Sequence, residues 1–451
     1  MSIATGKSSS FQAGMNRVTS RDRAPHDRPS ASMTGAVNFR RAAFILSLAI
    51  TCNAILAASL LTNKRTRYGA EAGGIAASIA EGKGFSSPFK QQSTGPSAWI
   101  PPAYPYLLAG IFRVFGVFTL ASYRVATVFN IVVHAITCML LYKAAGQVFG
   151  QRVGFYSACA LASFPLLFYP LALMRVLPGN AVGGARSLFI PPTNIWYHYL
   201  SELAILLLIL WTLVPPHWSV YGMTWGVSAL ANPTLLVLAP AFGVYLLSQR
   251  KSRRYLGLAA CVAALCISPW LARDYQIFHR LIPIRDNFGV ELDVGNQPGQ
   301  KGIWKAELHP STSSYELNRL AEMGEAEYTA AAKQDALHTI RTHPADFVGN
   351  TIRRVGYWWI GIPADSPRLG NLRFLINLPL LVFSALTFCG VVCALRTRNR
   401  GALLFVAVLF FYPIVFYVTH TYSIGYMYPI HPEMLALSFS AVLAEKVPTS
   451  S

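Results

Sequence analysis

The sequence predicts an all-α polytopic membrane protein. Of its 451 residues, 53% are hydrophobic and only 13% are charged, whereas a soluble domain carries about 25% charged residues. The mean hydropathy is +0.39, and several apolar runs approach the roughly 20 residues that a helix needs to cross a bilayer. Lipid is therefore expected to be the main solvent of the chain.

About ten transmembrane helices are expected from the order of apolar runs and basic turns. Lys and Arg gather on the cytoplasmic side of membranes, and the basic turns at 250–254 and 396–400 both fall there if the N-terminus is cytoplasmic. Asn232-Pro233 splits one apolar region, because proline removes a backbone donor and disfavours helix before it. The expected spans are 42–62, 121–142, 153–174, 195–214, two within 218–247, 255–271, 372–395, 402–418 and 428–444.

The same pattern divides the chain into five parts. The first is a disordered basic cytoplasmic tail, because it is rich in Ser, Arg and Pro and lacks an apolar core. The net charge of +19 is explained by this topology rather than by nucleic acid, which is not an expected partner. The parts are the tail 1–41, an N-terminal transmembrane module 42–272 with a first outer loop 63–118, an outer (periplasmic) segment of mixed structure 273–371, C-terminal transmembrane helices 372–445 and a cytoplasmic tail 446–451.

The stretch "STGPSAWIPPAYPYLLAGIFRVFG" (93–116) resembles a span but is too short and contains an arginine. A helix of this amphipathic kind lies along the membrane surface rather than across it. Trp99 is expected to anchor at the interface, and Pro101 and Pro102 to turn the chain into a surface helix beginning near Tyr104. This helix is a candidate floor for a cavity.

Two glutamates are candidate catalytic residues. Glu71 begins a short helical pattern just after the first span; it is either a general base facing a substrate at the bilayer edge or a carboxylate favoured by the helix dipole. Glu202 lies about two turns into the span 195–214. Acids within a membrane tend to be functional, although a hydrogen bond to His198, one turn earlier, also explains this one.

Arg273, Arg353 and Arg354 mark the outer ends of spans. Such arginines either snorkel towards water or bind phosphate through their planar fork of donors. Near the last outer turn, His431 lies among tyrosines and is expected near the cavity, although an interfacial aromatic belt explains the tyrosines.

Several established motifs are not found in the sequence. It has no His-x-x-x-His or clustered-Cys metal motif, no Walker loop, no dinucleotide fingerprint and no nucleophile elbow. No metal ligands are therefore assigned, and a substrate met at the membrane surface is favoured over soluble nucleotide chemistry.

The order of several blocks resembles bacterial GT-C glycosyltransferases, in the protein mannosyltransferase (glycosyltransferase family 39) and aminoarabinose-transferase-like superfamily. The likeness covers roughly 42–445 and rests on the order of the blocks. They are Glu71 followed by "GKGFSSPF" and "TGPSAWIPPAYPYLLAGIFRVFG", then "ALANPTLLVLAP", "SPWLARDYQIF", "RDNFGVELDVGN", and "THPADF" followed by "RRVGYWW".

The resemblance implies an enzyme of the bacterial inner membrane that takes a hexosyl or pentosyl group from a polyprenyl-phosphate carrier. It implies transfer to a protein, lipid or glycan acceptor on the outer face, with Glu71 as the base. The cations that hold the lipid phosphate map loosely onto Lys83, Arg273, Arg353 and Arg354. A divalent cation near Glu71 is left open as a cofactor.

The sequence also departs from its relatives. Glu71 is not part of an acidic pair, and 425–429 lacks the cations that many relatives carry before the last span. Two other classes therefore stay open: a transporter or flippase of lipid-linked sugar, which the broken helix at Asn232-Pro233 would suit, and a non-catalytic relative. The long outer segment favours the enzyme.

Overall fold

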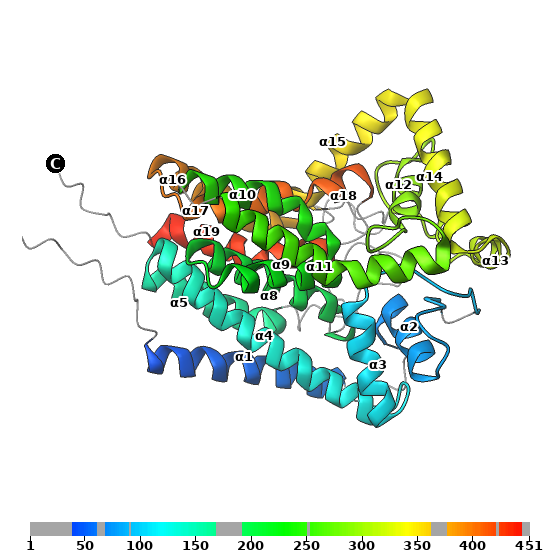
Figure 1. Cartoon of the computed structure of the whole chain (residues 1–451). Coiled ribbons are helices and arrows are strands. Elements are labelled where there is room, and N and C mark those ends of the chain that lie inside the picture. The colour runs from blue at the N-terminus through cyan, green and yellow to red at the C-terminus, as the bar shows by residue number, and fades with distance from the viewer. Residues whose placement is uncertain are drawn as a thin grey trace, which may run out of the picture. The chain divides into compact units, whose positions relative to one another are not determined.

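The computed structural model describes residues 38–60, 68–89, 92–167, 192–249, 253–361, 377–420 and 424–443. Within these ranges the elements are helices, with an isolated antiparallel bridge between Ser86 and Pro96 and a further bridge residue at Ile303. The predicted all-α class is confirmed (Figure 1).

Three of the described helices are long and apolar enough to cross a membrane: α4 (Leu120–Phe149), α11 (Arg253–Phe278) and α16 (Leu378–Arg396). Shorter apolar helices accompany them, so the chain is a multi-pass membrane protein; the total of about ten spans stays a prediction. The other helices in or next to predicted spans are α1 (Phe39–Leu60), α5 (Gln151–Leu167), α8 (Pro192–Leu213), α9 (Trp218–Ala231), η1 (Pro233–Leu238), α10 (Ala239–Ser248), α17 (Ala402–Phe411), α18 (Ile414–Val418), η4 (Ile424–Ile430) and α19 (His431–Leu443).

Two prolines break apolar runs. The break at Asn232-Pro233 is confirmed: the Asn232 side chain accepts a hydrogen bond from the Thr234 backbone at 3.1 Å and so caps η1. Pro413 separates α17 from α18, so the run predicted as one span over 402–418 is interrupted.

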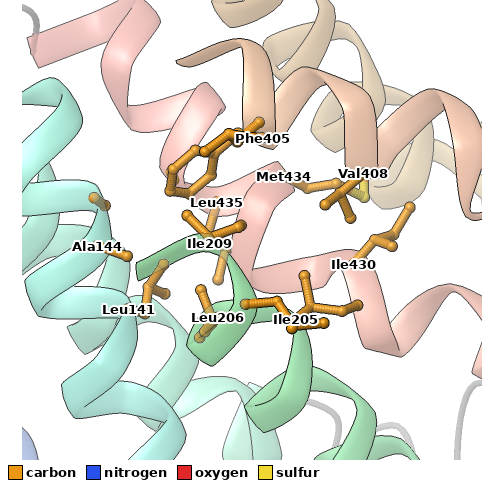
Figure 2. Packing of buried hydrophobic residues seen from close by; sticks show 14 of the residues in the cluster. Leu141, Ala144, Ile205, Leu206, Ile209, Phe405, Val408, Ile430, Met434 and Leu435 are labelled. Atoms are coloured by element: carbon orange, nitrogen blue, oxygen red, sulfur yellow. The ribbon is translucent and has the colours of Figure 1, made fainter. Parts of the chain in front are cut away.

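The largest core is formed between helices that are far apart in the sequence. Figure 2 shows Leu141 and Ala144 of α4, Ile205 and Ile209 of α8, Phe405 of α17 and Met434 of α19 meeting in one cluster. Close approach of α16 to α19 depends on Gly390, where an added Cβ would lie 2.0 Å from the Leu437 carbonyl oxygen. The C-terminal helices are thus packed directly against the N-terminal module.

The first outer loop folds as two helices, α2 (Ala70–Ala80) and α3 (Ala103–Phe115), which pack on each other. A helix at the predicted place is confirmed as α3, with Pro102 at its N-cap; its position along the membrane surface stays a prediction. Its buried face carries Tyr104, Leu108 and Phe112, and Arg113 donates to the Ile79 carbonyl at 3.3 Å. Arg113 therefore links α3 to α2.

The prediction that Trp99 anchors at the membrane interface is wrong. Trp99 is 1% exposed, and its ring packs edge-on against Phe89 (5.1 Å between centroids) and His309 (5.7 Å). A ring enclosed by two protein segments has no surface left for the bilayer. Trp99 therefore joins the first outer loop to the outer segment.

The regular elements of the described part of the outer segment are helices, joined by non-helical stretches such as 279–287 and 297–305. Its elements are α12 (Phe288–Asn296), η2 (Ala306–Leu308), α13 (Ser314–Met323), α14 (Glu325–Thr342) and α15 (Pro344–Ile360). The helix α11 continues to Phe278, beyond the predicted span end at 271, and carries Arg273 within it. The segment starts only after α11, with α12 packed on α14.

Candidate active-site cavity

A cavity of about 730 Å³ lies where the first outer loop, the outer segment and the membrane helices meet. One side is formed by α2 and the corner before α3, another by the chain around α12 and α14, and a third by η1, α18 and η4. The third side is apolar, and its members are Val237, Tyr412, Val415, Phe416 and Tyr426. Phe416 and Tyr426 stack with 4.8 Å between ring centroids.

Charged groups of both signs line the cavity. Glu71 lies in the first turn of α2, half-buried, and Gly69 before it takes a left-handed conformation with φ of 85°. The cations of the lining are Arg280, Arg285 and Lys333, all supplied by the outer segment. We call these three cations the basic wall; Asp286 and Glu291 line the cavity on the same side, and Glu71 is the acid on the first-loop side.

A chain of hydrogen bonds joins that basic wall to the end of α18. Arg285 Nε donates to Asn287 Oδ1 at 2.5 Å, and Asn287 Nδ2 donates to Glu291 Oε1 at 2.9 Å. His420 Nε2 lies 2.5 Å from Glu291 Oε2. Both carboxylate oxygens of Glu291 are therefore engaged, with the Arg285 guanidinium at one end of the chain and the His420 imidazole at the other. We call Arg285, Asn287, Glu291 and His420 the relay.

The charge of Glu291 is fixed by its surroundings. Burial acts to raise the pKa of Glu291, but contact with His420 and the charges of His309 and Arg285 lower it to about 2. The pKa of His309 is lowered by burial, while the charges of Glu291 and Glu71 act in the opposite direction. The two glutamates thus act on one imidazole from the two sides of the cavity.

Two further carboxyl groups share the wall behind the Trp99 corner. The Asp286 backbone donates to the Ala98 carbonyl at 3.1 Å, and the Ala98 backbone donates to Glu325. Burial raises the pKa of Asp286 to about 7 and that of Glu325 well above its usual range, the second also because Asp286 is close. At neutral pH at least one proton stays on this pair of carboxyl groups. The backbone of Ala98, next to Trp99, is hydrogen-bonded to both of these residues of the outer segment.

Arg354 joins α12 to α18. It is fully buried, and its guanidinium donates to the carbonyls of Tyr417 (3.1 Å) and Val418 (3.2 Å) at the end of α18. It also donates to the Gly302 carbonyl at 3.1 Å, to Asn296 Oδ1 at 2.9 Å and to the Gly295 carbonyl. A cation is favourable at helix carboxyl ends, and this one holds the backbone just before His420.

The structure brings four of the sequence-predicted residues to the cavity: Glu71, Trp99, Pro101 and Tyr104. Pro102 adjoins them as the N-cap of α3. The first-loop half of the site is therefore assembled from the predicted region.

The predicted phosphate cations do not lie in the cavity lining. Lys83 is exposed and pairs with Glu81 at 2.7 Å. Arg273 donates to the Ser97 carbonyl at 2.7 Å and to the Phe85 carbonyl at 3.0 Å, so it ties α11 to the first loop. Arg353 is exposed and bonds Asn350 at 2.9 Å, while Arg354 is enclosed as described above.

Glu202 and His431 also lie outside the lining. Glu202 is 3% exposed within α8, and its Oε2 has no hydrogen-bond partner among the described residues. His431 is 4% exposed and packs against Phe164 (4.8 Å between centroids) and Tyr428 (5.0 Å). Both belong to the interior of the helix bundle, whereas His198, one turn before Glu202, reaches the cavity.

The basic wall and the relay were missed in the sequence. Asn287 and Glu291 are four residues apart, as on one face of a helix, and that spacing could have indicated their contact. His420 lies 129 residues further along the chain, so no local pattern connects it to them. Within the described ranges, no group of three or more His, Cys, Asp or Glu residues could hold a metal ion.

Three comparisons with known proteins bear on this site. The family model described as dolichyl-phosphate-mannose-protein mannosyltransferase matches residues 100–177. The solved structure of ArnT from Cupriavidus metallidurans bound to undecaprenyl phosphate is 12% identical, covering 89% of this chain and 77% of that one with a TM-score of 0.34. A TM-score of 0.34 does not establish a shared fold. A comparison with curated proteins gives no match. The predicted resemblance to the protein mannosyltransferases, which are membrane glycosyltransferases of the GT-C superfamily, is thus confirmed over residues 100–177.

Proposed function

We propose that this protein is a membrane glycosyltransferase that moves a sugar from a polyprenyl-phosphate donor to an acceptor hydroxyl or amine. One observation carries the proposal: a single cavity joins a carboxylate, a basic wall and an apolar wall of membrane-helix residues. A polyprenyl-phosphate sugar has the same three parts, since a polar sugar and an anionic phosphate are attached to a long hydrocarbon.

Glu71 is the proposed general base. It removes the proton from the acceptor as the acceptor atom attacks C1 of the sugar, and the bond from C1 to the phosphate oxygen breaks with its electron pair on the phosphate. The basic wall of Arg280, Arg285 and Lys333 stabilises the charge that the leaving phosphate gains. The Lys333 side chain is exposed, and its ammonium makes no hydrogen bond or ion pair with the described residues, so it is available for this role.

The apolar wall supports a lipid rather than a nucleotide-sugar donor. Tyr412, Val415 and Phe416 belong to the α17–α18 region, which is one of the apolar helical runs of the chain. A hydrocarbon chain placed against them keeps its phosphate near the basic wall. The proposed site faces the outer side of the bacterial inner membrane, as the distribution of Lys and Arg predicts.

The test is transfer of radiolabelled sugar from hexosyl and pentosyl polyprenyl phosphates in membranes containing the full chain. Glu71→Gln should lower kcat by roughly 10²- to 10⁴-fold, the usual contribution of a general base. Glu81→Gln is the matched control, because Glu81 caps the other end of α2 and pairs with Lys83 outside the cavity.

Equal transfer by wild type and Glu71→Gln would remove Glu71 from the mechanism. Absence of transfer with every donor, together with movement of labelled lipid across the bilayer, would instead favour a flippase. Loss of activity in Glu81→Gln as large as in Glu71→Gln would mean that the substitutions act through α2 as a whole.

A further inference from the structure

We propose that His420 is a catalytic residue that, as an imidazolium, donates its Nδ1–H to the phosphate leaving group, and that Glu291 positions and charges it. This inference rests on the proposed function and concerns the same cavity. It assigns phosphate binding to the residues of the relay.

The first argument is the position of His420. It belongs to the cavity lining but is only 3% exposed, and its Nδ1 is buried with no hydrogen-bond partner among the described residues. A buried polar nitrogen without a partner is costly unless a ligand satisfies it. Its other nitrogen is already bound to Glu291.

The second argument is charge. Glu291 is ionised at neutral pH, since its pKa is about 2, and a carboxylate at 2.5 Å stabilises the imidazolium form of its partner. A histidine held by a carboxylate at one nitrogen presents the other in a fixed orientation, which is the arrangement that catalytic histidines use. In the imidazolium, Nδ1 carries a proton and can only donate.

The third argument is the relay as a unit. Glu291 also holds Arg285 through Asn287, and the Arg285 donors other than Nε make no hydrogen bond with the described residues. The relay therefore holds Arg285 of the outer segment and His420 at the end of α18 in one hydrogen-bonded chain, so that both can donate to a tetrahedral anion. The groups that act on His420 are Glu291, His309 and the Tyr426 ring at 5.9 Å between centroids.

The fourth argument is the rigidity of the backbone at His420. Asn296 Nδ2 donates to the Val418 carbonyl at 3.0 Å, and Arg354 donates to Tyr417 and Val418. An added Cβ at Gly295 would lie 1.9 Å from the Thr419 carbonyl oxygen. Three contacts thus fix the two residues before His420, as a preorganised donor requires.

In the reaction, the acceptor proton goes to Glu71 and the electron pair of the broken C1–O bond stays on the phosphate. His420 donates a hydrogen bond to that oxygen and retains its proton. The step therefore needs no further reactant.

The experiment measures transfer, its pH profile and binding of undecaprenyl phosphate by the full chain in nanodiscs. His420→Gln should lower kcat roughly 10²-fold, as for removal of one donor to a developing oxyanion, and weaken binding of the lipid phosphate by about tenfold. The control is His217→Gln, an exposed histidine between α8 and α9, which should match wild type.

The pH profile separates catalysis from structure. Wild-type kcat should fall at high pH, where the imidazolium loses its proton; Glu291→Gln should move that fall to lower pH, and His420→Gln should abolish it. Asp286, which also titrates in this wall, should not matter, so Asp286→Asn should keep the fall.

Three results would overturn the proposal. The first is a folded His420→Gln protein that keeps the wild-type kcat and lipid-phosphate affinity. The second is an unchanged pH profile in Glu291→Gln, and the third is a wild-type protein that does not bind undecaprenyl phosphate. If the His420→Gln protein does not accumulate, the pH profile of Glu291→Gln is the test of the proposal. Transfer by wild type with an unaffected His420→Gln would refute this inference alone, whereas no transfer by wild type would refute the proposed function.

Discussion

Replacement of Arg354 by methionine should destabilise the protein far more than the same change at its neighbour Arg353. Methionine keeps much of the side-chain volume but removes every donor. It leaves without that partner the buried carbonyls of Gly295 and Gly302 and the part-buried carbonyls of Tyr417 and Val418.

The magnitude follows from those bonds. Each orphaned buried acceptor costs about 1–3 kcal/mol, which would give about 2–6 kcal/mol for the two buried carbonyls if the terms were additive. Contacting groups are not additive, and Asn296 still donates to Val418. Loss of one partner from a buried charged network costs about 3–5 kcal/mol, and we expect Arg354→Met to fall in that range. Burial lowers the pKa of Arg354 to about 10, so the lost group is charged at neutral pH.

The assay is unfolding in mixed detergent micelles, followed by tryptophan fluorescence. Trp359 is a suitable reporter, since it lies on α15 and donates to the Tyr417 hydroxyl at 2.9 Å. Arg353→Met is the matched control; Arg353 is exposed, and surface changes usually stay within about 0.5 kcal/mol. A loss below about 1 kcal/mol for Arg354→Met, or equal losses for both variants, would refute the reasoning.

Two further predictions concern the same wall. Gly295→Ala should lower the free energy of unfolding by about 1–3 kcal/mol through overpacking and should lower transfer, because the added Cβ would collide with the Thr419 carbonyl. The control is Gly257→Ala in α11, which has nothing within 4 Å of the added Cβ and should match the wild-type free energy of unfolding to within about 1 kcal/mol. Equal losses of stability in the two variants would contradict the packing argument. The pKa of Asp286 is raised from 3.8 to about 7, so its proton stabilises the folded chain below about pH 4, and this stability is lost as the pH rises to about 7. Asp286→Asn should therefore gain stability relative to wild type across that window, by up to about 4 kcal/mol, in unfolding titrations at several pH values; a constant difference would contradict the assigned pKa.

Local features of the fold could be predicted from the sequence. The helix after Pro102 and the break at Asn232-Pro233 both depend on proline, whose missing donor and fixed φ act on adjacent residues alone. Glu71 at a helix start is equally local. These elements agree with the structure because no distant contact is needed to specify them.

The surroundings of individual charged and aromatic side chains could not be predicted in the same way. Arg353 and Arg354 are equivalent in sequence, but neighbours on a helix point about 100° apart, and only packing decides that Arg354 is enclosed and Arg353 exposed. The pairing of Glu291 with His420 likewise depends on how α12 meets α18. Trp99 was assigned to the interface because the sequence does not reveal that Phe89 and His309 cover it.

The order in which the cavity walls occur in the chain affects its biosynthesis. The walls run from Gly69 to Tyr426, so Glu71 leaves the ribosome long before the apolar wall and His420 do. A nascent chain that ends before Tyr412 contains most of its membrane helices, yet its cavity is open on the side where the lipid and phosphate would bind. Competence to bind a donor therefore arises only when α18 and η4 have been synthesised and packed, and release of a truncated chain yields a membrane protein without a complete site.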